Sequence, residues 1–216
     1  VGITGVTALT NGNYVVSSSE WTNNDPNNSI SYVGAVTWGN GSTGITGPVT
    51  PTNSLFGTSA GDQVGDFPGV TALTNGNYVV SSYRWDNGAS EDVGAVTWGN
   101  GITGTSGPVT PTNSLVGTSA LDRVGYNGVT ALTNGNYVVS SPYWNNGTIE
   151  YAGAVTWGNG STGSSGPVTP TNSLVGTSAN DAVGNGFYNA YYTNGVTALT
   201  NGNYVVSSKD WDNGTT

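Results

Sequence analysis

Oxygen-bearing side chains gather in one short stretch that directly follows a tryptophan and surrounds a glycine. They are Asp86, Asn87, Glu91 and Asp92. Carboxylate and amide oxygens around a glycine turn are the ligands that Ca²⁺ prefers. The same side chains also form Asx-turns, in which an Asp or Asn bonds its own backbone. The sequence thus leaves two readings open, a calcium site or a turn, and we expect no other cofactor.

The composition argues against an enzyme. The chain has no His and no Cys, and Lys and Arg together number 3 against 12 Asp and Glu. Acid–base catalysis would therefore depend on pairs of carboxylates held in contrasting environments. Acidic residues in solvated loops offer no such environments, so we expect no catalytic residues.

The charge and the apolar pattern restrict the partners. A formal net charge of −9 repels phosphate backbones, so nucleic acid is not expected as a partner. No apolar run reaches the length that spans a membrane. A polar chain without Cys or Met suits an extracellular or cell-surface location.

Tryptophans occupy two kinds of position. One set ends a strand-like run and is expected to pack between structural units: Trp38, Trp98 and Trp157. The other set follows a Ser-Ser pair and lies in variable loops: Trp21, Trp85, Trp144 and Trp211. These loop rings are candidate platforms for a ligand such as a sugar, and packing is the alternative because large rings bury much area.

Three aspartates share the pattern Asp-x-Val-Gly: Asp62, Asp122 and Asp181. We expect them to be structural and to bond loop amides between neighbouring units.

An internal repeat organises all of these residues. The sequence VTALTNGNYVVSS begins at Val6, Val70, Val129 and Val196 without a change. Such a period is typical of propellers, solenoids and tandem arrays. We delimit three repeats and a partial fourth, and expect one continuous unit cut from a longer array: residues 6–69, 70–128, 129–195 and 196–216. Packing does not require identical Thr and Asn in exposed turns, so we attribute the identity to recent duplication.

Each repeat reads as four short strands. In the first repeat, Val6–Leu9 and Tyr14–Ser18 flank an Asn-Gly turn, the strongest short signal for a hairpin. A third strand covers Gly34–Trp38, and a fourth lies within Pro48–Phe56, where the prolines favour an outer edge. A single sheet of this size cannot bury both faces, so the sheets must stack. The sequence predicts an all-β fold of four-stranded antiparallel blades of the β-propeller type, with a β-solenoid or a filament-forming repeat as the alternative.

The motifs VTALTNGNYVVSSPYW, GAVTWGNG and NSLVGTSANDAVG resemble the FG-GAP repeat of integrin α-subunit propellers. They are also similar to tandem repeats of large bacterial surface proteins. In the FG-GAP alignment, Val183-Gly184 stands where that family has Phe-Gly. The resemblance implies blades of a propeller and calcium bound in the loops that follow the second strand, although the alternating Asp spacing of that family is absent here.

These observations predict an extracellular structural or adhesive protein at the cell surface, multivalent or filament-forming. Self-association or continuation of the repeat array is expected, and glycans are candidate partners. The alternative is a lectin-like module that binds carbohydrate or calcium. The loops that vary between repeats are where recognition is expected: residues 19–33, 83–93 and 142–152.

Overall fold

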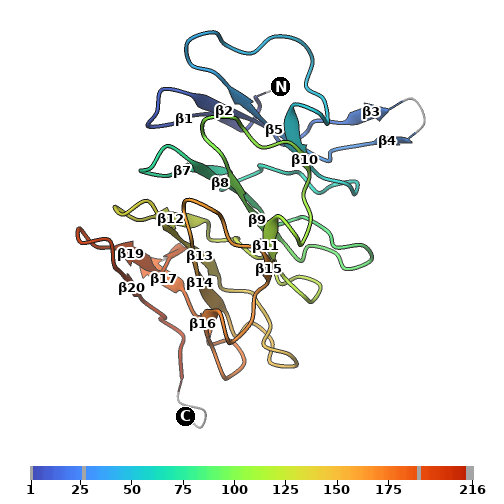
Figure 1. Cartoon of the computed structure of the whole chain (residues 1–216). Helices are drawn as coiled ribbons and strands as arrows, with labels where there is room; N and C mark the ends of the chain where they lie inside the picture. Colours follow the sequence, from blue (N-terminus) through green and yellow to red (C-terminus); the bar gives the residue numbers. More distant parts are fainter. Residues whose placement is uncertain (1, 26–27, 189–190, 213–216) are drawn as a thin grey trace.

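The structure is a computed structural model that describes residues 2–25, 28–188 and 191–212 (Figure 1). Within these residues the regular secondary structure is entirely β-strand, so the all-β prediction is confirmed. The part of the chain that is described contains no helix of the length and apolar character needed to cross a membrane.

The first repeat forms an antiparallel meander. Its four strands lie in the order β1-β2-β5-β6. Their bounds are Gly5–Ala8, Tyr14–Ser18, Ala35–Gly39 and Ser54–Phe56. The hairpin between β1 and β2 turns at Gly12, which has a φ of 88° that favours glycine, and closes through Leu9 N donating to Asn13 O at 2.8 Å. The Asn-Gly signal therefore gives the turn that it predicts.

The later repeats follow the same plan. The second repeat contributes β7 (Val70–Ala72), β8 (Tyr78–Ser82), β9 (Ala95–Gly99) and β11 (Ser114–Val116). The third contributes β12 (Val129–Ala131), β13 (Tyr137–Ser141), β14 (Ala154–Gly158) and β16 (Ser173–Val175). The fourth contributes β19 (Val196–Ala198) and β20 (Tyr204–Val206). The register is also kept, because Val15 faces Trp38 as Val79 faces Trp98 and Val138 faces Trp157.

The fourth strand is not the outer edge in the first two repeats, and our expectation is corrected there. Strand β10 (Gly107–Pro108) of the second repeat pairs in parallel with β6 of the first. Strand β15 (Gly166–Pro167) of the third repeat pairs likewise with β11. The proline-containing segment adds a fifth strand to the sheet of the repeat before it. Neighbouring repeats are therefore joined by backbone hydrogen bonds as well as by side chains.

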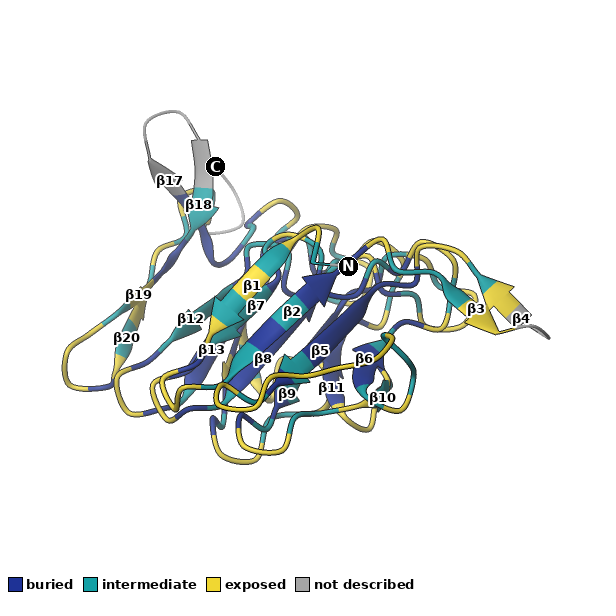
Figure 2. Cartoon of the chain, turned by 90° about the horizontal axis from the view of Figure 1, so that it is seen from above, coloured by how far each residue is buried: buried dark blue, intermediate teal, exposed yellow. Residues whose placement is uncertain are grey.

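Two small hairpins lie outside the stacked sheets, and the one in the first repeat projects away from them (Figure 2). One is β3 (Asn23–Asp25) with β4 (Asn28–Ile30), in the first variable loop. The other is β17 (Asn185–Tyr188) with β18 (Tyr191–Asn194), in the third repeat. Both lie outside the repeated pattern, as length differences between repeats predict.

The core lies between the sheets. Alternation along the strands sends Val15, Val36 and Leu55 from the first sheet toward Tyr78 and Val80 of the second, and all of these except Leu55 are 0% exposed. Equivalent apolar layers separate the second sheet from the third and the third from the fourth. The sheets are thus stacked face to face in a row (Figure 1). The described part of the chain does not close this row into a ring.

Candidate functional site

The contacts between successive repeats are here called the first, second and third junctions. They include the bonds made by Trp38, Trp98 and the three Asp-x-Val-Gly aspartates. At the first junction, Trp38 Nε1 donates to the carbonyl oxygen of Gly101 at 3.0 Å. At the second, Trp98 Nε1 donates to Gly160 O at 2.9 Å. Trp157 stands at the equivalent place of the third junction and is 43% exposed.

The invariant turn residues bond the same carbonyl groups. Asn11 Nδ2 and Asn13 Nδ2 each donate to Gly101 O at 2.8 Å. Asn75 Nδ2 and Asn77 Nδ2 donate to Gly160 O at 2.8 Å and 2.9 Å. Duplication alone therefore does not account for the identity of these turns. Sequence reasoning missed their role because a polar turn read in isolation is simply solvated.

Gly101 is required by a close approach of two turns in its own repeat. A Cβ on Gly101 would lie 1.7 Å from Gly76 O, far inside contact distance. The N–H of Gly101 also donates to Asn77 Oδ1 at 3.0 Å. A glycine at this place lets the carbonyl group face the preceding repeat.

At the other end of the first junction, Asp62 links the first repeat to the second. Its Oδ2 accepts the N–H groups of Thr58 and Ser59 at 2.7 Å and 2.8 Å, and its Oδ1 accepts the N–H of Asp86 in the next repeat at 3.0 Å. The side chain is 0% exposed. Burial raises the pKa of Asp62 to about 6, against the opposing effect of these N–H donors. Asp62 is thus a buried bridge between two repeats.

The other two aspartates of the pattern make the same bridge. Asp122 Oδ1 accepts from Asn145 N at 3.0 Å, and Asp181 Oδ1 accepts from Asp212 N at 3.1 Å. Burial raises the pKa of Asp122 above its usual value. Burial also acts to raise the pKa of Asp181, but its backbone N–H donors outweigh that effect and the pKa is lowered.

The loop tryptophans differ from one another in exposure. Trp85 and Trp144 are 3% exposed and belong to the apolar layers of the first and second junctions. The expectation of a sugar platform is corrected for these two, because no ring face is accessible. Trp21 is partly exposed and packs edge-on against Phe56, with ring centroids 6.4 Å apart, while Trp211 is 55% exposed.

Two of the four candidate calcium ligands, Asp86 and Asp92, bond protein groups through their side chains. Asp86 Oδ1 accepts the N–H of Asp92 at 2.8 Å, and Asp92 Oδ2 lies 3.3 Å from Arg123 Nη2. Asn87 forms an isolated β-bridge with Ser90, and Glu91 is exposed. Among the described residues, no three acidic, Cys or His side chains are grouped so that they could hold a metal. The geometry is that of a closed turn.

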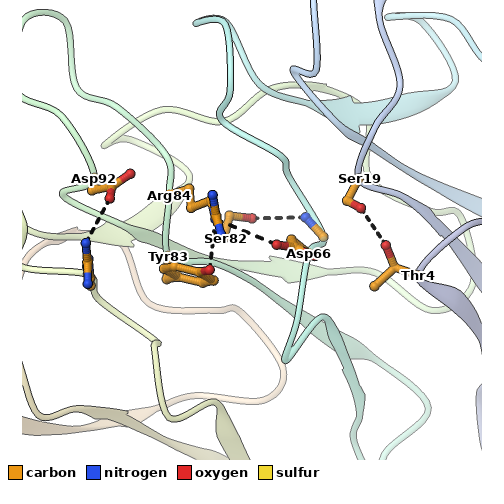
Figure 3. Close-up of polar contacts among 9 residues, drawn as sticks. Thr4, Ser19, Asp66, Ser82, Tyr83, Arg84 and Asp92 are labelled. Atoms are coloured by element: carbon orange, nitrogen blue, oxygen red, sulfur yellow. Dashed lines mark hydrogen bonds and ion pairs between the residues drawn. The ribbon is translucent and has the colours of Figure 1, made fainter.

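A row of tyrosines crosses the loops of the second and third repeats, and sequence reasoning did not single it out. The rings of Tyr83, Tyr126, Tyr143 and Tyr151 make successive edge-to-face contacts at 5.1, 4.7 and 5.8 Å. Arg84 lies over the Tyr83 ring, 5.2 Å from its centroid, and its Nε is 3.8 Å from Asp66 Oδ2 (Figure 3). The tyrosines come from different positions of the repeat, so no period in the sequence marks the row.

The sheets are stacked, each of the first two receives a strand from the following repeat, and the same junction contacts recur. These features define an all-β repeat protein. The chain belongs to the DUF5650 family, described as a repeat of unknown function, whose profile matches residues 8–66, 72–126, 131–185 and 198–216. Each match falls within one of the four repeats that we delimit. No curated protein shows a significant match to the chain.

Proposed function

We propose that the chain is part of an extracellular structural or adhesive protein of the cell surface, built of propeller-type β blades. The observation that carries this proposal is the atom-for-atom repetition of the junction. The Gly carbonyl, the Trp indole, the two Asn amides and the bridging Asp recur at the first and second junctions. A row of repeats joined in this way is a stiff scaffold that presents its loops at fixed spacing.

A stiff array serves adhesion through multivalency. Weak contacts made by several loops on one scaffold add avidity without any single strong site. The blade arrangement has support in the contacts of the first strands, since β7 lies against both β1 and β12, and β12 lies against β19. In a propeller the innermost strands approach one another in this manner.

Self-association is part of the proposal. Leu174 is 56% exposed on the third sheet, whereas its counterparts Leu55 and Leu115 are 1% exposed inside junctions. Val6 on the first sheet is 65% exposed. These apolar sheet faces match the faces that mate within the chain, so another repeat of the same kind fits them.

The alternative of a carbohydrate- or calcium-binding module has less support. Two of its four tryptophans are buried, and two of the three acidic side chains proposed as ligands, Asp86 and Asp92, bond protein groups. The burial of Trp85 and Trp144 argues against a sugar-binding surface at these rings, and the bonds of Asp86 and Asp92 argue against a calcium site in the variable loop of the second repeat.

The test combines location and adhesion. Antibodies against the chain should label intact cells that express its gene, and labelling only after permeabilisation would contradict the surface role. Beads coated with the chain, and beads coated at equal mass with a tandem fusion of two chains, should then be compared for retention on cell or matrix surfaces under flow. Multivalency predicts much stronger retention for the fusion, and equal retention would argue against it.

A further inference from the structure

The same cleft recurs at the first and second junctions. Its volume is about 270 Å³ at the first and about 350 Å³ at the second. Both clefts lie where Trp38 and Trp98 end their strands, at the end of the sheets away from the variable loops. Equivalent positions of the two adjoining repeats line them, so the repeat builds the same hollow twice.

One wall of each cleft is the indole ring of a strand-end tryptophan. Trp38 and Trp98 are partly exposed. The bonds from their Nε1 atoms to Gly101 O and Gly160 O fix the rings in place. A turn of the next repeat lies against the ring, because a Cβ on Gly104 would stand 2.8 Å from Trp38 Cβ. Each cleft therefore has a rigid aromatic surface whose only N–H group is already bonded.

The remaining walls carry hydroxyl groups and one amide. In the second cleft these belong to Thr105, Thr112, Asn113, Thr162, Ser164 and Ser165. The first cleft has the same kinds of side chain with one exception, since Ile45 stands where the second cleft has Thr105. The amide of Asn113 is held by bonds of 2.9 Å to Pro108 O and from Thr110 N.

Two serines at equivalent positions, Ser106 and Ser165, are exposed in the walls of the first and second clefts. Within the described part of the chain, neither hydroxyl group makes a side-chain hydrogen bond. Each can therefore donate to, and accept from, a bound molecule.

The lining selects a neutral ligand with several hydroxyl groups. None of the described residues that line the two clefts is charged, and the net charge of −9 disfavours an anion. A pyranose ring has a face of C–H groups that packs on an indole and a rim of hydroxyl groups that bond Ser, Thr and Asn. The volumes lie at the lower end of the range for ligand pockets, which suits one sugar ring.

We propose that the clefts of the first and second junctions each bind one neutral hexopyranose unit of a glycan. The two sites repeat with the period of the chain, so one glycan or several can bind along the row and gain avidity. As an account of adhesion this inference rests on the proposed function, whereas the clefts themselves follow from the junctions alone.

The chain offers matched variants for the test. The double variant Ser106→Leu with Ser165→Leu fills both clefts without adding a ring or a charge. The control is Ser42→Leu with Ser161→Leu, which makes the same changes at exposed turn positions that do not line either cleft. Far-ultraviolet circular dichroism and urea unfolding compare the folding of the two double variants.

Binding is measured with the soluble whole chain by saturation-transfer NMR and by titration of tryptophan fluorescence. The probes are the methyl pyranosides of glucose, galactose, mannose, fucose and N-acetylglucosamine. Sorbitol, which has the hydroxyl groups without the ring, is the reference. We expect at least one pyranoside to bind about tenfold more tightly than sorbitol, because only a closed ring presents a flat face to the indole. The cleft-filling variant should lose this binding, and the control variant should keep it.

Two results would overturn the proposal: no pyranoside binding above that of sorbitol, or wild-type binding in the folded cleft-filling variant. If that variant fails to fold, Ser106→Val with Ser165→Val replaces it and should still weaken binding about fivefold, since valine fills less of each cleft. Unchanged affinity there would reject the sites. These measurements need neither surface labelling nor retention under flow, so a failure of the clefts is distinguishable from a failure of the proposed function.

Discussion

The indole N–H of Trp38 bonds the carbonyl oxygen of Gly101, 63 positions further along the chain, at 3.0 Å. Trp98 makes the same bond to Gly160 one repeat later. This relationship joins the end of a strand in one repeat to a turn in the next. It makes the stability of each repeat depend on its neighbour, as in other repeat proteins.

The first prediction tests this bond. Trp38→Phe keeps a large ring but removes the donor, and should lower the free energy of unfolding by about 1–2 kcal/mol because Gly101 O loses a hydrogen bond at a packed junction. Trp157→Phe is the matched control and should change it by less than about 0.5 kcal/mol, since Trp157 is 43% exposed. Urea titration followed by circular dichroism measures both. Equal effects at the two positions would show that the bond from Trp38 to Gly101 O adds nothing to the free energy of unfolding.

The second prediction concerns the close approach of the two turns. Gly101→Ala should lower the free energy of unfolding by more than about 3 kcal/mol, because its Cβ would collide with backbone at 1.7 Å from Gly76 O. The neighbouring change Ile102→Ala should be nearly neutral, since Ile102 is 73% exposed. Thermal melting compares the two variants. A stable Gly101→Ala protein would mean that the turns separate easily.

The third prediction concerns the turn after Trp85. Asp86→Ala should destabilise the chain by about 1 kcal/mol, because the N–H of Asp92 loses its acceptor. Asp86→Asn should be nearly neutral, since Asn145 already serves in this way in the third repeat, accepting from Tyr151 N at 2.9 Å. Melting curves of wild type should superimpose with excess calcium and with EDTA. If calcium raised the melting temperature of wild type and Asp86→Asn abolished that rise, the turn would be a calcium site after all.

The fourth prediction is a pH dependence. Burial raises the pKa of Asp62 to about 6 from 3.8, so the folded state binds a proton more tightly than the unfolded state. The resulting stability is fully present below about pH 4 and is lost as the pH rises through 6. From this group alone the free energy of unfolding should be about 2 kcal/mol higher at pH 4 than at pH 7. Asp122, whose pKa is also raised, acts in the same direction. The lowered pKa of Asp181 acts only below this window.

Asp62→Asn tests that assignment. The variant should flatten the pH profile of urea unfolding and also lower stability at pH 4, because one amide cannot accept all three backbone N–H groups that surround Asp62. Glu91→Gln, at an exposed position, is the control and should keep the wild-type profile. An unchanged slope in Asp62→Asn would assign the dependence to other carboxylates.

Local signals in the sequence were sufficient to predict the strands of each repeat. The Asn-Gly turn sets the hairpin of each repeat, and alternation along Ala35–Gly39 sets which side chains face the next sheet. The parallel pairing of Gly107–Pro108 could not be predicted in the same way, because its partner Leu55–Phe56 belongs to another repeat and no turn connects them. The prolines favoured an edge position but did not indicate which sheet has that edge.

The candidate site was less predictable. The loop position of Trp85 favoured exposure, yet the stacking of the second sheet on the first buries it. Asp86 and Asp92 carry metal-binding chemistry, but their orientation toward backbone N–H and Arg123 depends on how the turn closes.

The sequence by itself determined the period, the hairpins, the alternating faces and the need for sheets to stack, because turn geometry and side-chain alternation are properties of neighbouring residues. Only the tertiary structure decided which tryptophans are buried and which carbonyl groups the turn amides bond. Those outcomes depend on contacts between residues about one repeat apart, and such contacts exist only after the sheets have packed.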